Sequence, residues 1–258
     1  MPSSIKLAIV AALEREIQPL ISGWPATTKR SSDRTFRFFE NSDTVVVCGG
    51  IGAEPARRAA EAVIALYAPE IVYSAGFAGA LDPALKVADI LVPARVIDAG
   101  DSSSVETDVS RAISCQGASR GVLVTFGAVA TPGQKVKLAK SFNAQAVDME
   151  AAAVARAAAA RGVRFAAVKV ISDEVGFQLP GMDREKLVTE SGEFRTARFA
   201  CSILIRPWTW PAALRLARNS HRAALALCAW LDENRERLRH PKEGKSPESD
   251  SPKISAQL

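Results

Sequence analysis

The chain has 258 residues, of which 48% are hydrophobic and 24% charged, and its net charge is +5. This composition is typical of a globular protein with one α/β domain, or one domain plus an appendage. Four scattered cysteines and two late histidines, His221 and His240, indicate no zinc site, disulfide framework or Ser-His-Asp triad. No apolar stretch is long enough to span a bilayer, and Glu14 and Glu16 follow the first apolar run too closely for a signal peptide. We expect a reduced, cytoplasmic protein.

Apolar strands alternate with helices along the first 175 residues. The first apolar run is followed by a helix that opens at Leu13, and a second helix is expected over 54–67, where Pro69 stops it. This alternation predicts an α/β fold with a central sheet that is covered on both faces. The predicted strands are 5–12, 36–38, 44–48, 71–75, 88–92, 121–126 and 163–171.

Residues 146–156 are the stretch around which the prediction is organised. A short apolar strand ends in Asp148 and Glu150, which flank Met149, and an alanine-rich run with high helix propensity follows at once. Both carboxylates therefore fall at a helix N-terminus, where they are favoured by unpaired N–H groups. From this segment alone, the simplest explanation is that both carboxylates only cap the helix.

Nearly every predicted strand ends in glycines or in a polar cluster. In sheets of this kind, ligands bind in the crevice outside the carboxyl ends of the strands. Turn chemistry is the alternative explanation, but five such ends in one chain favour a small-molecule pocket. The five ends are 14–16, 49–52, 76–79, 148–150 and 172–174.

The C-terminal part differs in character from the rest. Residues 212–231 predict an amphipathic helix with arginines on one face, close to Trp208, Trp210 and Trp230. Such a helix packs on the core or on a partner subunit, or it rests on a membrane surface. We divide the chain into a catalytic domain (1–200), a Trp/Arg-rich helical extension (201–240) and a disordered tail (241–258).

The chemistry open to the predicted pocket is that of carboxylates and backbone donors. The loop 49–52 lacks both the dinucleotide-binding glycine spacing and the Lys-Ser/Thr of a phosphate-binding loop. Carboxylates suit cleavage of a glycosidic bond, which needs an acid for the leaving group and anionic groups near the cationic sugar.

Five separated motifs give the sequence a specific resemblance. In order and spacing they resemble the superfamily of purine nucleoside phosphorylases and methylthioadenosine/adenosylhomocysteine nucleosidases. The resemblance covers about residues 5–175. It implies a three-layer α/β/α domain with a mixed, partly barrel-like sheet, a homodimer or higher oligomer, and no cofactor or metal. The motifs are Ala12-Leu13-Glu14-Arg15-Glu16, Gly50-Ile51-Gly52, Ala75 to Leu81 with Lys86 to Ile90, Val147 to Ala151, and Ile171-Ser172-Asp173.

The segment from Leu204 to Leu231 is similar to the hopanoid-associated phosphorylases. This resemblance implies that adenine is removed from adenosylhopane, and that the enzyme is peripheral to the inner face of the membrane rather than bound to nucleic acid. The alternatives are a soluble methylthioadenosine/adenosylhomocysteine nucleosidase, a purine nucleoside phosphorylase, and a nucleoside-binding module without turnover.

The superfamily resemblance also implies roles for individual residues. Asp173, helped by Ser172, would protonate the purine at N7, and Glu16 would orient the attacking water. The substrate-binding residues would be Glu150 and Met149 at the ribose, Ile51, Gly52 and Phe77 at the sugar and nucleophile pocket, and Val129 and Ala130 at the base.

Three departures from the superfamily pattern bear on these roles. Phe77 replaces a small hydroxyl residue near the nucleophile, Val129 replaces an aromatic that stacks on the base, and Lys169 replaces an arginine near the acid. Phe126 and Phe177 are the candidates to stack on the base instead. The sequence leaves water and inorganic phosphate both open as nucleophile, and Glu16 favours water.

Overall fold

The computed structural model describes residues 5–108, 118–177 and 210–239. The described helices are α1 (Glu14–Ile21), α2 (Ala53–Tyr67), α3 (Pro132–Phe142), α4 (Ala151–Ala159), α7 (Trp210–Glu233) and α8 (Arg235–Arg239). The strands are β1 (Leu7–Ala11), β2 (Ala26–Ser31), β3 (Arg34–Asn41), β4 (Thr44–Cys48), β5 (Ile71–Ala80), β6 (Ile90–Leu91), β7 (Arg95–Asp98), β8 (Ser104–Glu106), β9 (Ala118–Ser119), β10 (Val122–Thr125), β11 (Ala146–Asp148) and β12 (Arg164–Asp173).

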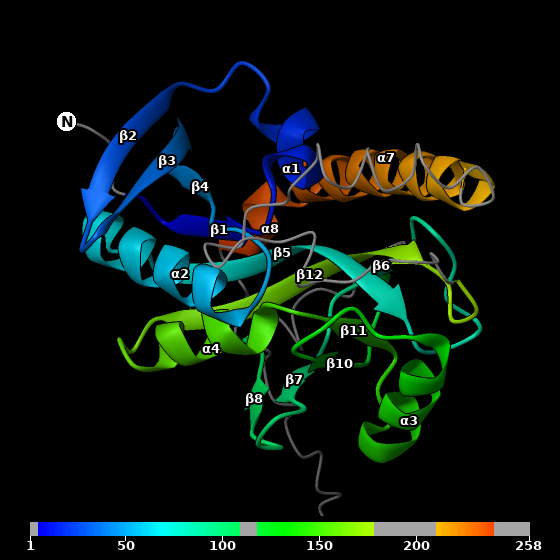
Figure 1. The fold of residues 1–258 in the computed structure, drawn as a ribbon. Helices are drawn as coiled ribbons and strands as arrows, with labels where there is room; N and C mark the ends of the chain where they lie inside the picture. The colour runs from blue at the N-terminus through cyan, green and yellow to red at the C-terminus, as the bar shows by residue number, and fades with distance from the viewer. Residues whose placement is uncertain (1–4, 109–117, 178–209, 240–258) are drawn as a thin grey trace, which may run out of the picture.

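All of these strands join one mixed sheet with β5 at its centre (Figure 1). Helices α2 and α4 cover one face of the sheet, and α1 and α7 cover the other. Side chains of β5 alternate between the two faces, as the pleat of a buried strand requires. Val72 belongs to the apolar cluster that contains residues of α2 and α4, and Tyr73 belongs to the cluster that contains residues of α7. The predicted α/β class is confirmed, and the pairings among the described strands leave the sheet open rather than closed into a barrel.

One edge of β5 changes partner along its length. Residues 71–74 pair with β1 in parallel, whereas Gly79 and Ala80 pair with β11 in the antiparallel direction. The other edge of β5 pairs with β12 in parallel from Ile71 to Gly79, with one register shift between Ile171 and Asp173. Between Ser74 and Gly79, therefore, none of the described strands pairs with the first edge of β5. This gap lies at the carboxyl end of β1 and is the place where a parallel sheet of this type leaves a crevice.

The structure departs from the sequence prediction at several elements. β5 continues to Ala80, so that residues 76–79 belong to the strand instead of forming a loop after it. β6 is only two residues long, and β2 and β8 occupy segments for which no strand was predicted. Helix α3 was also not predicted. Its start carries a capping box between Thr131 and Gln134, with Pro132 in the first turn, which is a sequence signal for a helix N-terminus.

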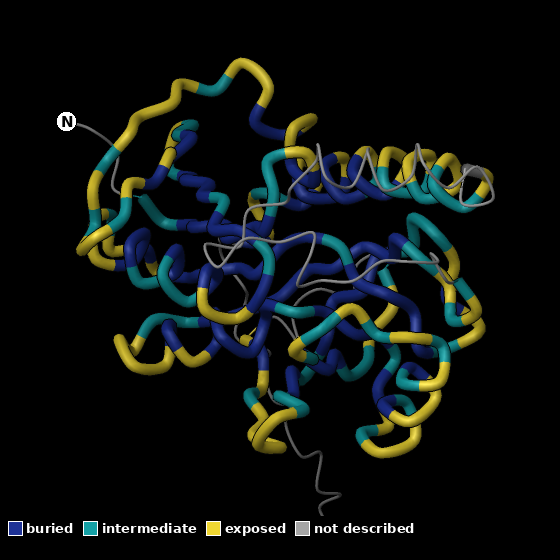
Figure 2. The backbone as a smooth tube through the Cα atoms, viewed as in Figure 1, coloured by how far each residue is buried: buried dark blue, intermediate teal, exposed yellow. Residues whose placement is uncertain are grey.

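The core comprises two large apolar clusters, one on each side of the sheet, and a smaller third cluster that includes Val124, Leu138 and Val147. Figure 2 shows the buried residues concentrated in the central strands and on the inner sides of the helices. The C-terminal half of α7 belongs to the second large cluster, where Leu227, Trp230 and Leu231 are buried. Leu214, in the N-terminal half of α7, is 60% exposed. Part of the predicted amphipathic helix thus packs on the core. Trp208, the domain boundary at residue 200 and the tail after residue 240 lie outside the described residues.

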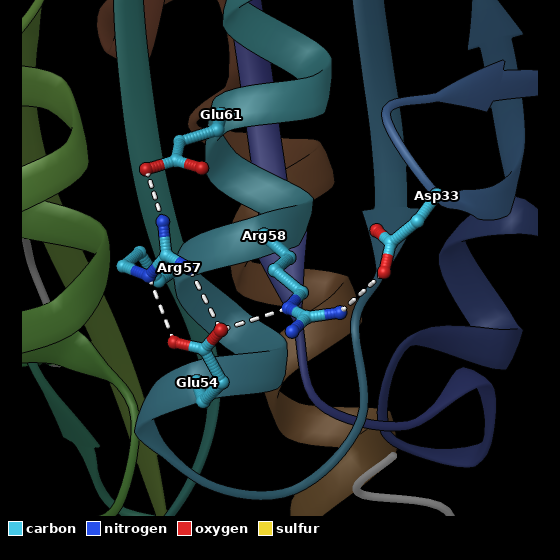
Figure 3. A network of polar contacts seen from close by, with 5 residues as sticks. All are labelled: Asp33, Glu54, Arg57, Arg58 and Glu61. Carbon is cyan, nitrogen blue, oxygen red and sulfur yellow. Dashed lines mark hydrogen bonds and ion pairs between the residues drawn. The ribbon is translucent and has the colours of Figure 1, made fainter.

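A network of polar contacts surrounds the first turns of α2 (Figure 3). Arg57 and Arg58 both pair with Glu54, and Arg58 reaches Asp33 in the turn between β2 and β3. These side chains are exposed, and exposed ion pairs contribute little to stability. The position of α2 is therefore set chiefly by its buried face, which includes Ala56, Ala59, Ala60 and Val63.

Candidate active site

A cavity lies at the gap beside β5. Its lining includes residues from all five of the strand ends that were predicted to converge, and also from the start of α3. All of the predicted site residues except Gly52 are among those that line it, and Gly52 bonds directly to a lining residue. The lining comprises Ala12, Leu13, Arg15, Glu16, Ile51, Phe77, Ala78, Gly79, Ala128, Val129, Ala130, Lys135, Val147, Asp148, Met149, Glu150, Ser172 and Asp173.

Glu16, in the first turn of α1, is buried at the floor of this cavity. Its carboxyl group accepts a hydrogen bond from the backbone N–H of Phe77, a residue of β5 that pairs with β12 on one edge only. The Glu16 carboxyl thus takes the place of the carbonyl that a neighbouring strand would otherwise offer to this N–H. Burial raises the pKa of Glu16 to about 8, and the nearby Glu150 carboxylate adds to the effect. Glu16 is therefore mostly protonated at pH 7.

Gly76 gives the Glu16 carboxyl its space. Its φ is +152°, a conformation that side chains disfavour, and a Cβ at this position would lie 2.6 Å from Oε2 of Glu16. The close approach of backbone to carboxyl therefore requires glycine here.

Glu150 lies opposite, at the N-terminus of α4, and is 9% exposed. Its Oε1 accepts a 2.8 Å hydrogen bond from the backbone N–H of Gly52, and its Oε2 accepts a bond from the N–H of Met149 at 3.3 Å. Burial and the neighbouring Asp148 raise the pKa of Glu150. The loop before α2 is thus tied to the loop before α4 across the cavity.

Asp148, in contrast to Glu150, stabilises the fold through its own buried contacts. Its side chain is fully buried and accepts hydrogen bonds from the Thr125 hydroxyl at 2.6 Å and from the Ala151 N–H at 2.8 Å. The Lys169 ammonium lies 2.9 Å from its Oδ2. Of the two carboxylates that the sequence places at the start of α4, Asp148 is the one that caps the helix.

Lys169 is the cation at the centre of this carboxylate cluster. Its side chain is 2% exposed. Burial opposes its charge, but Asp148 and Glu150 outweigh burial, so the pKa of Lys169 is raised and the ammonium persists. The sequence analysis placed Lys169 near Asp173, whereas the structure pairs it with Asp148.

Asp173 and Ser172 end β12 at the other side of the cavity. The Ser172 hydroxyl donates to Oδ1 of Asp173 at 2.8 Å, and the ammonium of Lys135 from α3 forms an ion pair with Oδ2. Lys135 also donates to the Glu174 carbonyl at 2.9 Å. The sequence analysis did not find Lys135, because α3 was not predicted and a helical lysine carries no local signal of burial.

The rim of the cavity is less polar than its floor. Val129 is 50% exposed, and Ala130, Ile51 and Phe77 are half-buried. Phe126 and Phe177 are not among the described residues that line this cavity. Within the described ranges, no group of three or more His, Cys, Asp or Glu side chains is arranged to hold a metal ion.

The sequence matches the model of the phosphorylase superfamily over residues 6–123 and 118–204. The chain therefore belongs to the phosphorylase superfamily. Among curated relatives, it is 25% identical to the aminodeoxyfutalosine nucleosidase of Campylobacter jejuni over 200 residues, which cover 67% of this chain and 87% of that protein. It is 24% identical to the 5′-methylthioadenosine/S-adenosylhomocysteine nucleosidase of Lysinibacillus sphaericus, with the same coverage of the two chains.

Solved structures share the fold. The methylthioadenosine/adenosylhomocysteine nucleosidase of Neisseria meningitidis, in complex with methylthio-immucillin-A, superposes with a TM-score of 0.65 at 18% identity, covering 88% of this chain and 97% of that one. The futalosine hydrolase of Helicobacter pylori gives a TM-score of 0.62 at 20% identity, covering 89% and 98%. These likenesses confirm the predicted architecture.

Proposed function

We propose that this protein cleaves the N-glycosidic bond of an adenine nucleoside with a modified 5′ group and releases adenine. The observation that carries the proposal is the meeting of Glu16, Glu150 and Asp173, from three distant parts of the chain, in one cavity at the carboxyl end of β1. The curated relatives include nucleosidases named for methylthioadenosine, adenosylhomocysteine and aminodeoxyfutalosine. An acid at one end of such a cavity and anionic groups at the other suit departure of a purine from a cationic ribosyl group.

In this proposal Asp173, oriented by Ser172, donates a proton to N7 of the purine. The electron pair of the glycosidic bond then passes to the base, and positive charge develops on the ribose. Glu150 accepts hydrogen bonds from the ribose hydroxyls, since both of its oxygens are fixed by backbone N–H groups at the cavity wall. Met149 lies against the sugar face, while Val129 and Ala130 border the base.

The nucleophile in the proposal is water, which Glu16 orients and deprotonates. The position of Glu16 at the cavity floor and its pKa of about 8 support this role, because a base works best near the pH at which it operates. Phosphorolysis is the alternative. Of the described lining residues, Arg15 and Lys135 are the basic ones, and Lys135 is already paired with Asp173, so a phosphate dianion finds few cationic anchors.

For the 5′ group we propose a hopanoid lipid, with methylthioadenosine-type salvage as the alternative. Support comes from α7, whose N-terminal half carries exposed Leu214 beside Arg215 and Arg218. Arg215 and Arg222 also line a second cavity, together with Lys86, Glu174 and Phe177. Basic and apolar side chains together suit a membrane surface. None of the described helices is long and apolar enough to cross a membrane.

A substrate panel tests the proposal. Adenine release is followed by chromatography from methylthioadenosine, adenosylhomocysteine, inosine and adenosylhopane, each with and without phosphate. Release from adenosylhopane alone supports the lipid substrate, and release from the thio-nucleosides supports salvage. Phosphate dependence would replace hydrolysis by phosphorolysis. Binding to anionic liposomes, compared between the wild type and R215E/R218E, tests the membrane contact separately, and equal sedimentation of both proteins would count against it.

A further inference from the structure

Lys135 is a buried ammonium whose position the proposed roles above do not explain. It lies in the second turn of α3 and is 2% exposed, whereas Lys137 and Lys140 on the same helix are exposed. Its ammonium contacts one carboxylate, that of Asp173, and one carbonyl, that of Glu174. Removing an ammonium from water is costly unless it is paired and hydrogen-bonded. The fold thus places the Lys135 ammonium against Asp173, although the ammonium loses its contact with water.

The backbone of β5 is shaped to admit this pair. A Cβ at Gly79 would lie 3.0 Å from Oδ2 of Asp173 and 3.1 Å from Nζ of Lys135. Three elements therefore meet around one carboxylate: β12 supplies Asp173, α3 supplies the ammonium, and β5 leaves the space. With Ser172 bonded to Oδ1 and Lys135 bonded to Oδ2, both oxygens of Asp173 are fixed in place.

We propose that Lys135 is a positioning residue for protonation of the leaving group. The inference rests on the proposed function, in which Asp173 gives its proton to N7 as the bond between C1′ and N9 breaks. Asp173 ends that step as a carboxylate, and the ammonium of Lys135 stabilises the negative charge and holds its orientation. Lys135 stays protonated throughout. Because its ammonium is paired with Asp173 and donates to the Glu174 carbonyl, it acts through Asp173 rather than on the purine.

A substrate whose leaving group departs without a proton can distinguish this positioning role of Lys135 from a merely structural one. Methylthioadenosine, or adenosylhopane where that is the substrate cleaved, is compared with the 4-nitrophenyl riboside that carries the same 5′ group. Nitrophenolate departs without protonation. Its release should therefore not change when the Lys135 ammonium no longer assists Asp173. Lys135→Met removes the charge at similar length, and Lys137→Met makes the same substitution at an exposed site of α3.

We expect K135M to lower kcat for the adenine nucleoside about 10²-fold, as the loss of assistance to a general acid does. Release of nitrophenolate should stay close to that of the wild type, which also shows that the variant folds. K137M should match the wild type on both substrates, and K135R, which keeps the charge, should recover much of the nucleoside activity.

Two results would overturn the inference about Lys135. One is an equal loss of activity on both substrates in K135M and also in K135R, which would show that Lys135 has only a structural role. The other is normal nucleoside cleavage by K135M. A wild-type protein that releases nitrophenolate but no adenine would instead refute the proposed adenine nucleoside substrate, and one that releases neither would refute glycosidic cleavage itself.

Discussion

The protonation of Glu16 links the fold to a measurable pH dependence. Its pKa of about 8 means that the Glu16 carboxyl is ionised in only about a tenth of the molecules at pH 7. If ionised Glu16 deprotonates the attacking water, kcat/KM for the free enzyme should rise about tenfold per pH unit below pH 8 and level off above it. The cause lies in the structure, because burial and the adjacent Glu150 keep the carboxyl neutral.

The assay is adenine release measured from pH 5.5 to 9.5 at constant ionic strength. Glu16→Gln keeps the size of the side chain but cannot accept the proton, so its rate should fall at least about 10²-fold and lose the rise toward pH 8. Glu14→Gln is the matched control, since Glu14 is two residues away, has a side chain that is 42% exposed and pairs with Arg37. A wild-type rate that is flat between pH 6 and 8, or the same rise in E16Q, would refute the reasoning.

The same group predicts how stability changes with pH. Between pH 4.5 and about 8 the folded protein holds the Glu16 proton while the unfolded chain has released it, so stability falls as pH rises through this window. The difference corresponds to at most about 5 kcal/mol, which neighbouring titrations reduce. Urea unfolding at several pH values should show this slope in the wild type and a smaller one in E16Q.

Three further substitutions follow from the site. Asp173→Asn should keep the fold and lower kcat about 10²- to 10⁴-fold; near-normal adenine release would remove Asp173 from the mechanism. Lys169→Met should cost about 3–5 kcal/mol in urea unfolding, because Asp148 is left buried without its cation, and Asp148→Asn in the same chain should recover part of this loss; an unchanged midpoint would contradict the pairing. Gly76→Ala should lower kcat/KM with a smaller effect on stability, since its Cβ would displace the Glu16 carboxyl; normal kcat/KM would show that the carboxyl can move without consequence.

The sequence predicted the fold class and the convergence of strand ends because both depend on local patterns. Apolar runs alternate with helical periods, and polar or glycine residues follow each run. The extension of β5 through Gly76 to Ala80 was missed because glycine ordinarily signals a break. Here tertiary pairing with β12 and β11 holds those residues in the strand.

The ion pairs of the site were beyond the reach of sequence patterns. Lys135 is 38 residues from Asp173 in the chain, and Lys169 is 21 residues from Asp148. Nothing near either lysine in the sequence distinguishes it from a solvated one, because its burial depends on how α3 and β12 pack. The capping box at Thr131 was a usable signal for the start of α3. It would have predicted the helix, but not that Lys135 is buried, because a charged residue gives no sign of an apolar face.

The most direct test of the account is whether the purified protein releases adenine from methylthioadenosine or adenosylhopane in the absence of phosphate. The account predicts multiple turnovers, with adenine and the free 5′-modified ribose formed in equal amounts. Binding of the intact nucleosides with no base released over many hours would contradict it, and would identify the cavity as a site for recognition without cleavage.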